Sequence, residues 1–161
     1  MKHFMFLLLF MLPASKISFS QEHNIHPVKY IFDPKANAKE DLNNAIAAAG
    51  KAHKHILILV GGDWSMASRE LDTVLKKDYV LKTLADGFVF MRLNFSPSNK
   101  NEAIREQLQC PKYKGYPLLV VLDENGKTLL AQTADEFRSP THGYIAAKVE
   151  KSLRAWAMLP K

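Results

Sequence analysis

The stretch "ILILVGGDWSMASRELDTVL", residues 56–75, decides the fold of this chain. Its first five residues form a continuous apolar run with β-branched members, which is typical of a strand buried on both faces. Gly61 and Gly62 follow as turn residues, and without a Gly-x-Gly-x-x-Gly pattern they do not indicate a nucleotide-binding loop. A helix is predicted to begin near Ser65, because apolar residues recur behind it at helical spacing. The stretch therefore predicts a buried strand, a turn and a helix in direct succession.

The segments on either side continue the alternation of strands and helices. Residues 37–54 predict a helix, because Asn37 and Glu40 have the spacing of a capping box. A short strand is expected before it, at residues 30–32. The helix that follows the Gly-Gly turn is expected to break near Asp78 and to resume beyond it.

The second half of the chain starts with another strand, predicted over residues 88–95. A short helix is expected over residues 101–109, with Asn99 and Glu102 as its capping pair.

A hairpin is predicted over residues 117–133, where two apolar runs flank the sequence Asp-Glu-Asn-Gly. Asn125 and Gly126 are expected to supply the positive backbone dihedral angles of its turn. A C-terminal helix follows, with Ser139 as the predicted cap and Pro140 as the predicted first residue.

The order of predicted elements is β-α-β-α-β-α-β-β-α. Strands that alternate with helices and end in a hairpin and a helix predict an α/β fold, with a central mixed sheet flanked by helices on both faces. An apolar fraction of 47% and a charged fraction of 24% are those of an ordinary globular protein. We expect one domain over residues 30–157, followed by a tail at residues 158–161.

The N-terminus has the pattern of a secretory signal peptide over residues 1–20. Its apolar run, residues 4–12, is shorter than the roughly 20 residues that span a bilayer. Cleavage is expected ahead of Gln21, which leaves a flexible lead-in at residues 21–29. The predicted location is the periplasm or the outside of the cell, with membrane contact only through an uncleaved signal peptide.

The charge pattern does not indicate a nucleic-acid partner. Without Lys2 and Lys16, which lie in the predicted signal peptide, the formal net charge falls from +6 to +4. The remaining charges are mixed in sign and form no long basic run, which is typical of a solvated surface.

Two motifs show a resemblance to a known family. The first is "GGDWSMAS", residues 61–68, which resembles the redox-active turn of the thioredoxin-like superfamily. The second is "KGYPLLVVLDENGK", residues 114–127, which resembles the hairpin that follows a proline in that superfamily. The chain looks most similar to the exported bacterial thiol–disulfide oxidoreductases of the DsbH type. The resemblance implies a thioredoxin fold and a cis peptide bond before Pro117. It also implies that Ser65 and Ser68 stand where the family has the two cysteines of its Cys-x-x-Cys motif.

Serine at both positions removes the chemistry of thiol–disulfide exchange, because a thiolate must attack and a second thiol must resolve the mixed disulfide. Ser65 is instead expected to cap the helix, with Ser68 as a small residue of its first turn. A serine nucleophile would need a neighbouring base. His53 and His55 precede the strand, at roughly 16 Å from the turn by strand length, so this chemistry is not expected.

The one cysteine, Cys110, excludes an internal disulfide. It is interpreted as a small buried side chain, with single-thiol chemistry as the alternative. His23 and His26 lack a third ligand, and we interpret them as solvated. No metal and no cofactor is expected.

Trp64, Met66, Tyr116 and Pro117 are the candidate binding residues, together with Ser65. Aromatic residues favour both recognition surfaces and cores, so packing remains open for them. The sequence favours a redox-inactive module that binds an unidentified exported protein or peptide. The alternative is a thiol–disulfide oxidoreductase whose cysteines were deliberately replaced by serine.

Overall fold

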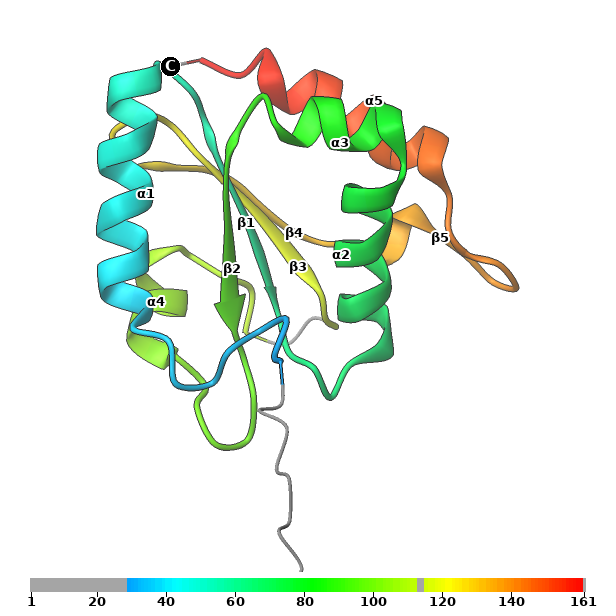
Figure 1. Cartoon of the computed structure of the whole chain (residues 1–161), viewed down its shortest axis with the longest axis horizontal. Coiled ribbons are helices and arrows are strands. Elements are labelled where there is room, and N and C mark those ends of the chain that lie inside the picture. The colour runs from blue at the N-terminus through cyan, green and yellow to red at the C-terminus, as the bar shows by residue number, and fades with distance from the viewer. Residues whose placement is uncertain (1–28, 113–114, 161) are drawn as a thin grey trace, which may run out of the picture.

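A computed structural model describes residues 29–112 and 115–160 (Figure 1). The predicted signal peptide, His23, His26 and nearly all of the predicted lead-in lie outside these described residues. None of the helices in the described part of the chain combines the length and the apolar character that crossing a membrane requires.

The centre of the molecule is a mixed sheet of four strands in the order β2-β1-β3-β4. β1 pairs with β2 in parallel and with β3 in antiparallel orientation, and β3 and β4 form an antiparallel hairpin. The strands span β1 (Ile56–Gly61), β2 (Val89–Asn94), β3 (Leu118–Leu122) and β4 (Thr128–Thr133). This arrangement confirms the predicted mixed sheet.

Helices cover both faces of the sheet (Figure 1), as predicted. One face carries α1 (Ala38–Ala52) and α4 (Glu102–Gln107). The other carries α2 (Met66–Lys77), α3 (Tyr79–Ala85) and α5 (Ala146–Ala157). The 3-10 turn η1 (Asp135–Phe137) and a small hairpin of β5 (Arg138–Ser139) and β6 (Gly143–Tyr144) connect β4 to α5.

Two apolar cores result, one on each face of the sheet. Successive side chains of a strand point to opposite faces, so the fully buried β1 supplies both cores. Leu57 and Leu59 join the core under α2, α3 and α5, whereas Ile56, Ile58 and Val60 join the core under α1 and α4. This double burial is why the run has no polar alternation.

The helix starts of the first half follow the sequence. Asn37 Oδ1 accepts the Glu40 N–H at 3.3 Å, which confirms Asn37 as the N-cap, and the Glu40 carboxylate accepts the Asn37 side-chain amide at 3.2 Å in place of the backbone N–H of a capping box. The break at Asp78 is also confirmed. Its carboxylate accepts the Leu81 N–H at 3.0 Å, so Asp78 ends α2 and caps α3.

The predicted strand at residues 30–32 is wrong. The Ile31 N–H donates to Asp63 Oδ2 at 3.0 Å instead of joining the sheet, and Phe32 inserts its ring into the core with 1% exposure. A turn follows at once, with the Ala36 N–H bonded to the Asp33 carbonyl. The segment is therefore tied down by one side-chain hydrogen bond and one buried ring.

The predicted capping pair Asn99 and Glu102 is also wrong, although the short helix is present. The Asn99 amide donates to the Pro34 carbonyl at 2.9 Å, and its oxygen accepts the Asn101 N–H at 3.1 Å. Asn99 therefore joins two loops, and Asn101 occupies the N-cap position of α4 without a side-chain cap bond.

The turn of the β3–β4 hairpin differs in one residue from the prediction. Gly126 has a φ of 87°, as expected, but Asn125 keeps a negative φ. The Asp123 carboxylate fixes the turn by accepting the N–H groups of Asn125 and Lys127 at 2.9 and 2.8 Å. One left-handed residue is therefore sufficient.

The predicted start of the last helix at Ser139 and Pro140 is wrong. Ser139 pairs with Gly143 in the β5–β6 hairpin, and Pro140 lies in the loop of that hairpin. Helix α5 begins only at Ala146, because the chain first has to turn back through Gly143, whose φ is 73°.

Candidate functional site

The candidate site lies at the turn that connects β1 to α2. The Gly62 carbonyl accepts the Ser65 N–H at 3.0 Å and closes this turn. Ser65 has an extended backbone, and its hydroxyl accepts the Ser68 N–H at 3.2 Å. Ser65 is therefore the N-cap of α2, as predicted, and it is 8% exposed. The cap satisfies one of the free N–H groups of the first helical turn.

Ser68 lies beneath this cap and has no exposed surface. Its hydroxyl has no hydrogen-bond partner. The side chain packs against the backbone of Gly61, where an added Cβ would come within 2.5 Å of Ser68 Oγ and 3.4 Å of the Phe32 ring. Ser68 thus occupies a small, apolar space in which its hydroxyl contributes no hydrogen bond.

Trp64 stands above the turn and is 56% exposed. Its indole N–H donates to the Phe95 carbonyl at 2.6 Å. The indole passes so close to Gly62 that an added Cβ there would meet both the indole nitrogen and the Phe95 carbonyl at 2.5 Å. Only glycine at this position lets the tryptophan lie across the end of β2.

Three aromatic rings meet beside the turn, and we call Trp64, Phe95 and Tyr116 the aromatic cluster. Trp64 meets Tyr116 edge-on, with ring centroids 5.9 Å apart, and Tyr116 stacks on Phe95 at 4.4 Å. The Tyr116–Pro117 peptide bond is cis, as the resemblance implies. The structure thus brings Trp64 and Tyr116 together from the two motifs.

Two residues at this site, Phe95 and Arg105, were not predicted as site residues from the sequence. Phe95 follows the carboxyl end of β2, and the Arg105 guanidinium lies 4.6 Å from its ring and 5.8 Å from that of Tyr116. A signal for Phe95 existed, because the carboxyl ends of neighbouring parallel strands share one edge of the sheet. Nothing in the local pattern around Arg105 pointed to this contact.

Cys110 lies apart from the two serines. It packs in the core under α1 and α4, whereas Ser68 belongs to α2 on the opposite face of the sheet. Burial raises the pKa of its thiol to about 11, and the positive charge of Arg105 offsets this only in part. A thiol with this pKa is protonated near neutral pH, so Cys110 is a poor nucleophile.

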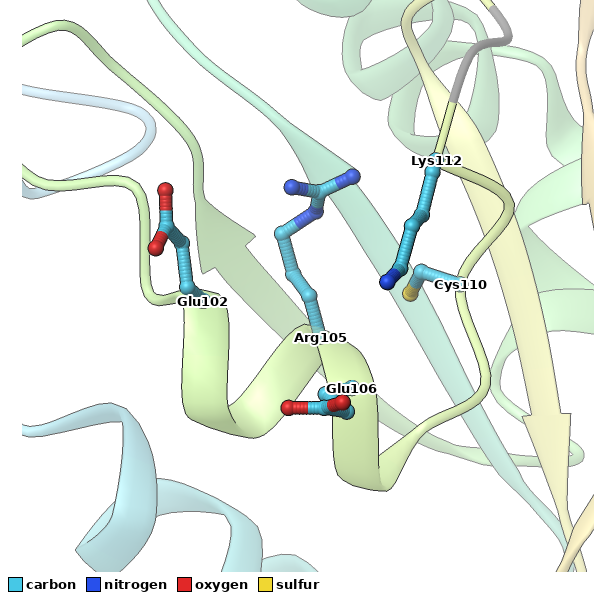
Figure 2. Close-up of a pocket in the computed structure, with 5 residues that line it drawn as sticks. All are labelled: Glu102, Arg105, Glu106, Cys110 and Lys112. Atoms are coloured by element: carbon cyan, nitrogen blue, oxygen red, sulfur yellow. The ribbon is translucent and has the colours of Figure 1, made fainter.

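A pocket of about 260 Å³ opens beside Cys110 (Figure 2). The Arg105 side chain extends from α4 between Glu102 and Lys112. The pocket is lined by Glu102, Arg105, Glu106, Cys110 and Lys112.

Serine-based chemistry would need a base beside Ser65, and a metal site would need several ligating side chains together. Among the described histidines, His53 and His55 precede β1, at the end of the strand opposite Ser65, and His142 lies in the loop between β5 and β6. Within residues 29–112 and 115–160, no three His, Cys, Asp or Glu side chains gather where they could hold a metal ion.

Comparison with solved structures shows the same fold in redox proteins. A disulphide isomerase from Xylella fastidiosa Temecula1 is 20% identical, with a TM-score of 0.65 over 80% of this chain and 97% of that one. A DsbH oxidoreductase is 24% identical, with a TM-score of 0.51 over 73% and 82%. A redox protein from Chlamydomonas reinhardtii is 21% identical, with a TM-score of 0.53 over 76% and 34%.

Comparison with curated protein sequences gives no significant match. The family model described as thioredoxin-like matches residues 37–124, which is more than half of the chain. These residues run from the N-cap of α1 to the turn of the β3–β4 hairpin and include both serines, the aromatic cluster and Pro117. The protein therefore belongs to the thioredoxin-like family.

Proposed function

We propose that this is an exported thioredoxin-fold protein, periplasmic or secreted, that binds a peptide or protein segment at the aromatic cluster and does not exchange disulfides. The observation that carries the proposal is that the start of α2 has no thiol while exposed apolar side chains lie around it. Trp64 and Met66 are 56% and 74% exposed on either side of Ser65, which is itself buried.

The two serines support the absence of exchange. Exchange needs a thiolate that attacks and a second thiol that resolves the mixed disulfide. Ser65 accepts a backbone N–H with its hydroxyl, and Ser68 is fully enclosed. Neither oxygen can form a disulfide, and neither contacts a base among the described residues.

The aromatic cluster supports the binding role. Several large apolar side chains that are exposed to solvent side by side indicate an interaction surface. Trp64 is fixed by its hydrogen bond to the Phe95 carbonyl and by its edge contact with Tyr116. A fixed aromatic ring loses little conformational entropy when a ligand packs on it, which favours binding.

Single-thiol chemistry at Cys110 is the weaker alternative. The thiol is 8% exposed, and burial raises its pKa to about 11. Both properties oppose reaction with a disulfide near neutral pH.

A disulfide-reductase assay tests the redox half of the proposal. We expect no turnover by the protein and none by Cys110→Ala. A variant with Ser65→Cys and Ser68→Cys serves as comparator, and activity in it alone would assign the loss to the missing thiols. Turnover by the unmodified protein that disappears in Cys110→Ala would overturn the proposal.

Calorimetric titration tests the binding half, with pentapeptides blocked at both ends that carry Phe, Leu or Met at the centre. We expect Trp64→Ala and Met66→Ala to weaken binding. Tyr79→Ala and Met158→Ala are matched controls, because these side chains are 84% and 85% exposed on α3 and beyond α5. Equal effects of the two sets would contradict a binding surface at the aromatic cluster.

Export is tested by fractionating cells that make the full chain and weighing the mature protein by mass spectrometry. We expect a species that begins at or near Gln21 in the periplasm or the medium. An intact chain in the cytoplasm would contradict export.

A further inference from the structure

The charged side chain of Arg105 has no ion-pair partner among the described residues. Among the described arginines, Arg105 and Arg69 have no carboxylate within 4.0 Å, whereas Arg92, Arg138 and Arg154 each face one at 2.6, 3.9 and 2.9 Å. The Arg105 Nε–H is buried and has no acceptor. Hydrogen-bond donors of a charged group are usually satisfied when buried, so the unpartnered Nε–H calls for an explanation.

The guanidinium is held in place by rings instead of by acids. It lies 4.6 Å from the centre of Phe95 and 5.8 Å from that of Tyr116, within cation–π range of both. These contacts place the guanidinium beside the rings, and no hydrogen bond from it to another described residue is present. The two acids of the same helix, Glu102 and Glu106, do not neutralise it, although both line the same pocket.

The pocket in front of Arg105 is suited to a small anion. It has a volume of about 260 Å³, and Figure 2 shows the Arg105 side chain between Glu102 and Lys112, with the end of the Lys112 side chain beside Cys110. Because the pKa of the Cys110 thiol is about 11, this side chain adds no negative charge to the pocket near pH 7. Two cations and two glutamates line the pocket, so the pocket has no excess positive charge and a preference for an anion depends on direct contact with the guanidinium.

We propose that this pocket binds a carboxylate of the peptide ligand through the Arg105 guanidinium, beside the aromatic cluster. The inference rests on the proposed peptide-binding function and adds the chemical class of the segment that is bound. A planar guanidinium matches a planar carboxylate with paired hydrogen bonds. A phosphate dianion would meet more repulsion from Glu102 and Glu106, so a singly charged carboxylate is the better match.

Tyr116 links the pocket to the exposed surface. One side of its ring system meets Trp64, and Arg105 lies over the stacked pair of Tyr116 and Phe95. A bound segment can therefore place an apolar side chain on Trp64 and an acidic group on Arg105. The preferred ligand is a peptide in which an aspartate, a glutamate or a chain terminus follows an apolar residue.

Calorimetry with two blocked pentapeptides tests this, Gly-Phe-Leu-Asp-Gly and its counterpart with asparagine in place of aspartate. We expect the acidic peptide to bind about tenfold more tightly, as for a hydrogen bond to a charged group. Arg105→Gln should abolish the difference, and Arg105→Lys should recover only part of it. Arg154→Gln is the matched control, because it removes the same charge on α5 and should keep the preference.

Each outcome decides one part. Equal binding of both peptides, weakened by Trp64→Ala, would overturn the carboxylate pocket and leave the proposed function standing. An Arg105-dependent preference that Trp64→Ala does not change would uphold the pocket and overturn binding at the aromatic cluster. Binding of neither peptide would overturn both. Stronger competition by inorganic phosphate than by acetate would overturn the choice of carboxylate.

Folding of each variant is checked by its melting temperature. If Arg105→Gln unfolds, the NMR signal of the Arg105 Nε–H in the unmodified protein gives an independent readout. We expect the acidic peptide to shift this signal and the asparagine peptide to leave it in place, and the absence of a shift would overturn the pocket.

Discussion

The hydroxyl of Ser65 accepts the backbone N–H of Ser68 at 3.2 Å, while the hydroxyl of Ser68 itself is buried and has no partner. Two serines three residues apart therefore have opposite energetic roles. The first satisfies a helix donor, and the second places a polar atom in an apolar space without compensation.

This contrast predicts different effects of the two alanine variants. Ser65→Ala should lower the free energy of unfolding by about 1 kcal/mol, because α2 loses its cap. Ser68→Ala should leave stability unchanged or raise it by up to about 1 kcal/mol, because it removes an unpaired buried hydroxyl. Urea unfolding measures both values, and equal losses in the two variants would contradict the assignment.

The contact between Gly61 and Ser68 predicts a steric effect. A Cβ at Gly61 would lie 2.5 Å from Ser68 Oγ and 2.8 Å from Ser68 Cβ, and the short serine side chain cannot move far. We expect Gly61→Ala to destabilise the protein by about 1–3 kcal/mol in thermal or urea unfolding. Adding Ser68→Gly should cost less than the sum of the two single changes, and strict additivity would argue against the contact.

Asp72 offers a test of buried charge. It is 2% exposed, and its carboxylate oxygens lie 2.6 Å from Arg92 and from Lys76. Asp72→Asn should destabilise the protein by about 1.5–3 kcal/mol in urea unfolding, because the buried side chain loses its hydrogen bonds to two charged groups. Asp86→Asn removes the exposed pair with Lys82 and should cost less than about 1 kcal/mol. Similar costs would contradict the difference in burial.

The raised pKa of Cys110 predicts the pH profile of its alkylation. Since the thiolate reacts and the thiol pKa is about 11, the rate with iodoacetamide should rise about tenfold per pH unit from pH 8 to pH 10. In denaturant the alkylation rate should stop rising near pH 9, because the thiol pKa without burial is 9.0. A plateau below pH 9 in the folded protein would contradict the raised pKa.

The same shift predicts a loss of stability at high pH. Because folding raises the pKa of Cys110, the folded protein binds more protons than the unfolded chain between about pH 9 and pH 11. Its contribution to stability is fully present below pH 9 and falls as the pH rises toward 11. Cys110→Ala should lose less stability over this range in urea unfolding, and an unchanged slope would contradict the linkage.

The regular elements were predictable where the signal is local and repeated. Three predicted features depend on neighbours within a few residues. These are the strand from Ile56 to Val60, the N-cap at Asn37 and the break at Asp78, and all three are confirmed. The strand at residues 30–32 and the cap at Asn99 were wrong because distant partners, Asp63 and Pro34, take up their hydrogen-bonding groups.

The candidate site was predictable only in part. Trp64, Tyr116 and Pro117 belong to motifs that are recognisable in the chain, and the structure brings them together. Phe95 and Arg105 joined them without being predicted, because their contacts depend on how β2 and α4 are placed in the fold.

By itself, the sequence determined the succession of strand, turn and helix at residues 56–75 and the absence of sulfur at Ser65 and Ser68. Both follow from residue identity and local spacing, which act before the chain is packed. The sequence also predicted Ser65 as the cap, and only the tertiary structure showed that the Ser68 hydroxyl is buried without a partner. The tertiary structure also decided that Trp64 reaches Phe95 across 31 residues and that the Arg105 Nε–H is buried without an acceptor among the described residues. These relationships depend on the parallel pairing of β1 with β2 and on the packing of α2 and α4, which no short stretch of the chain encodes.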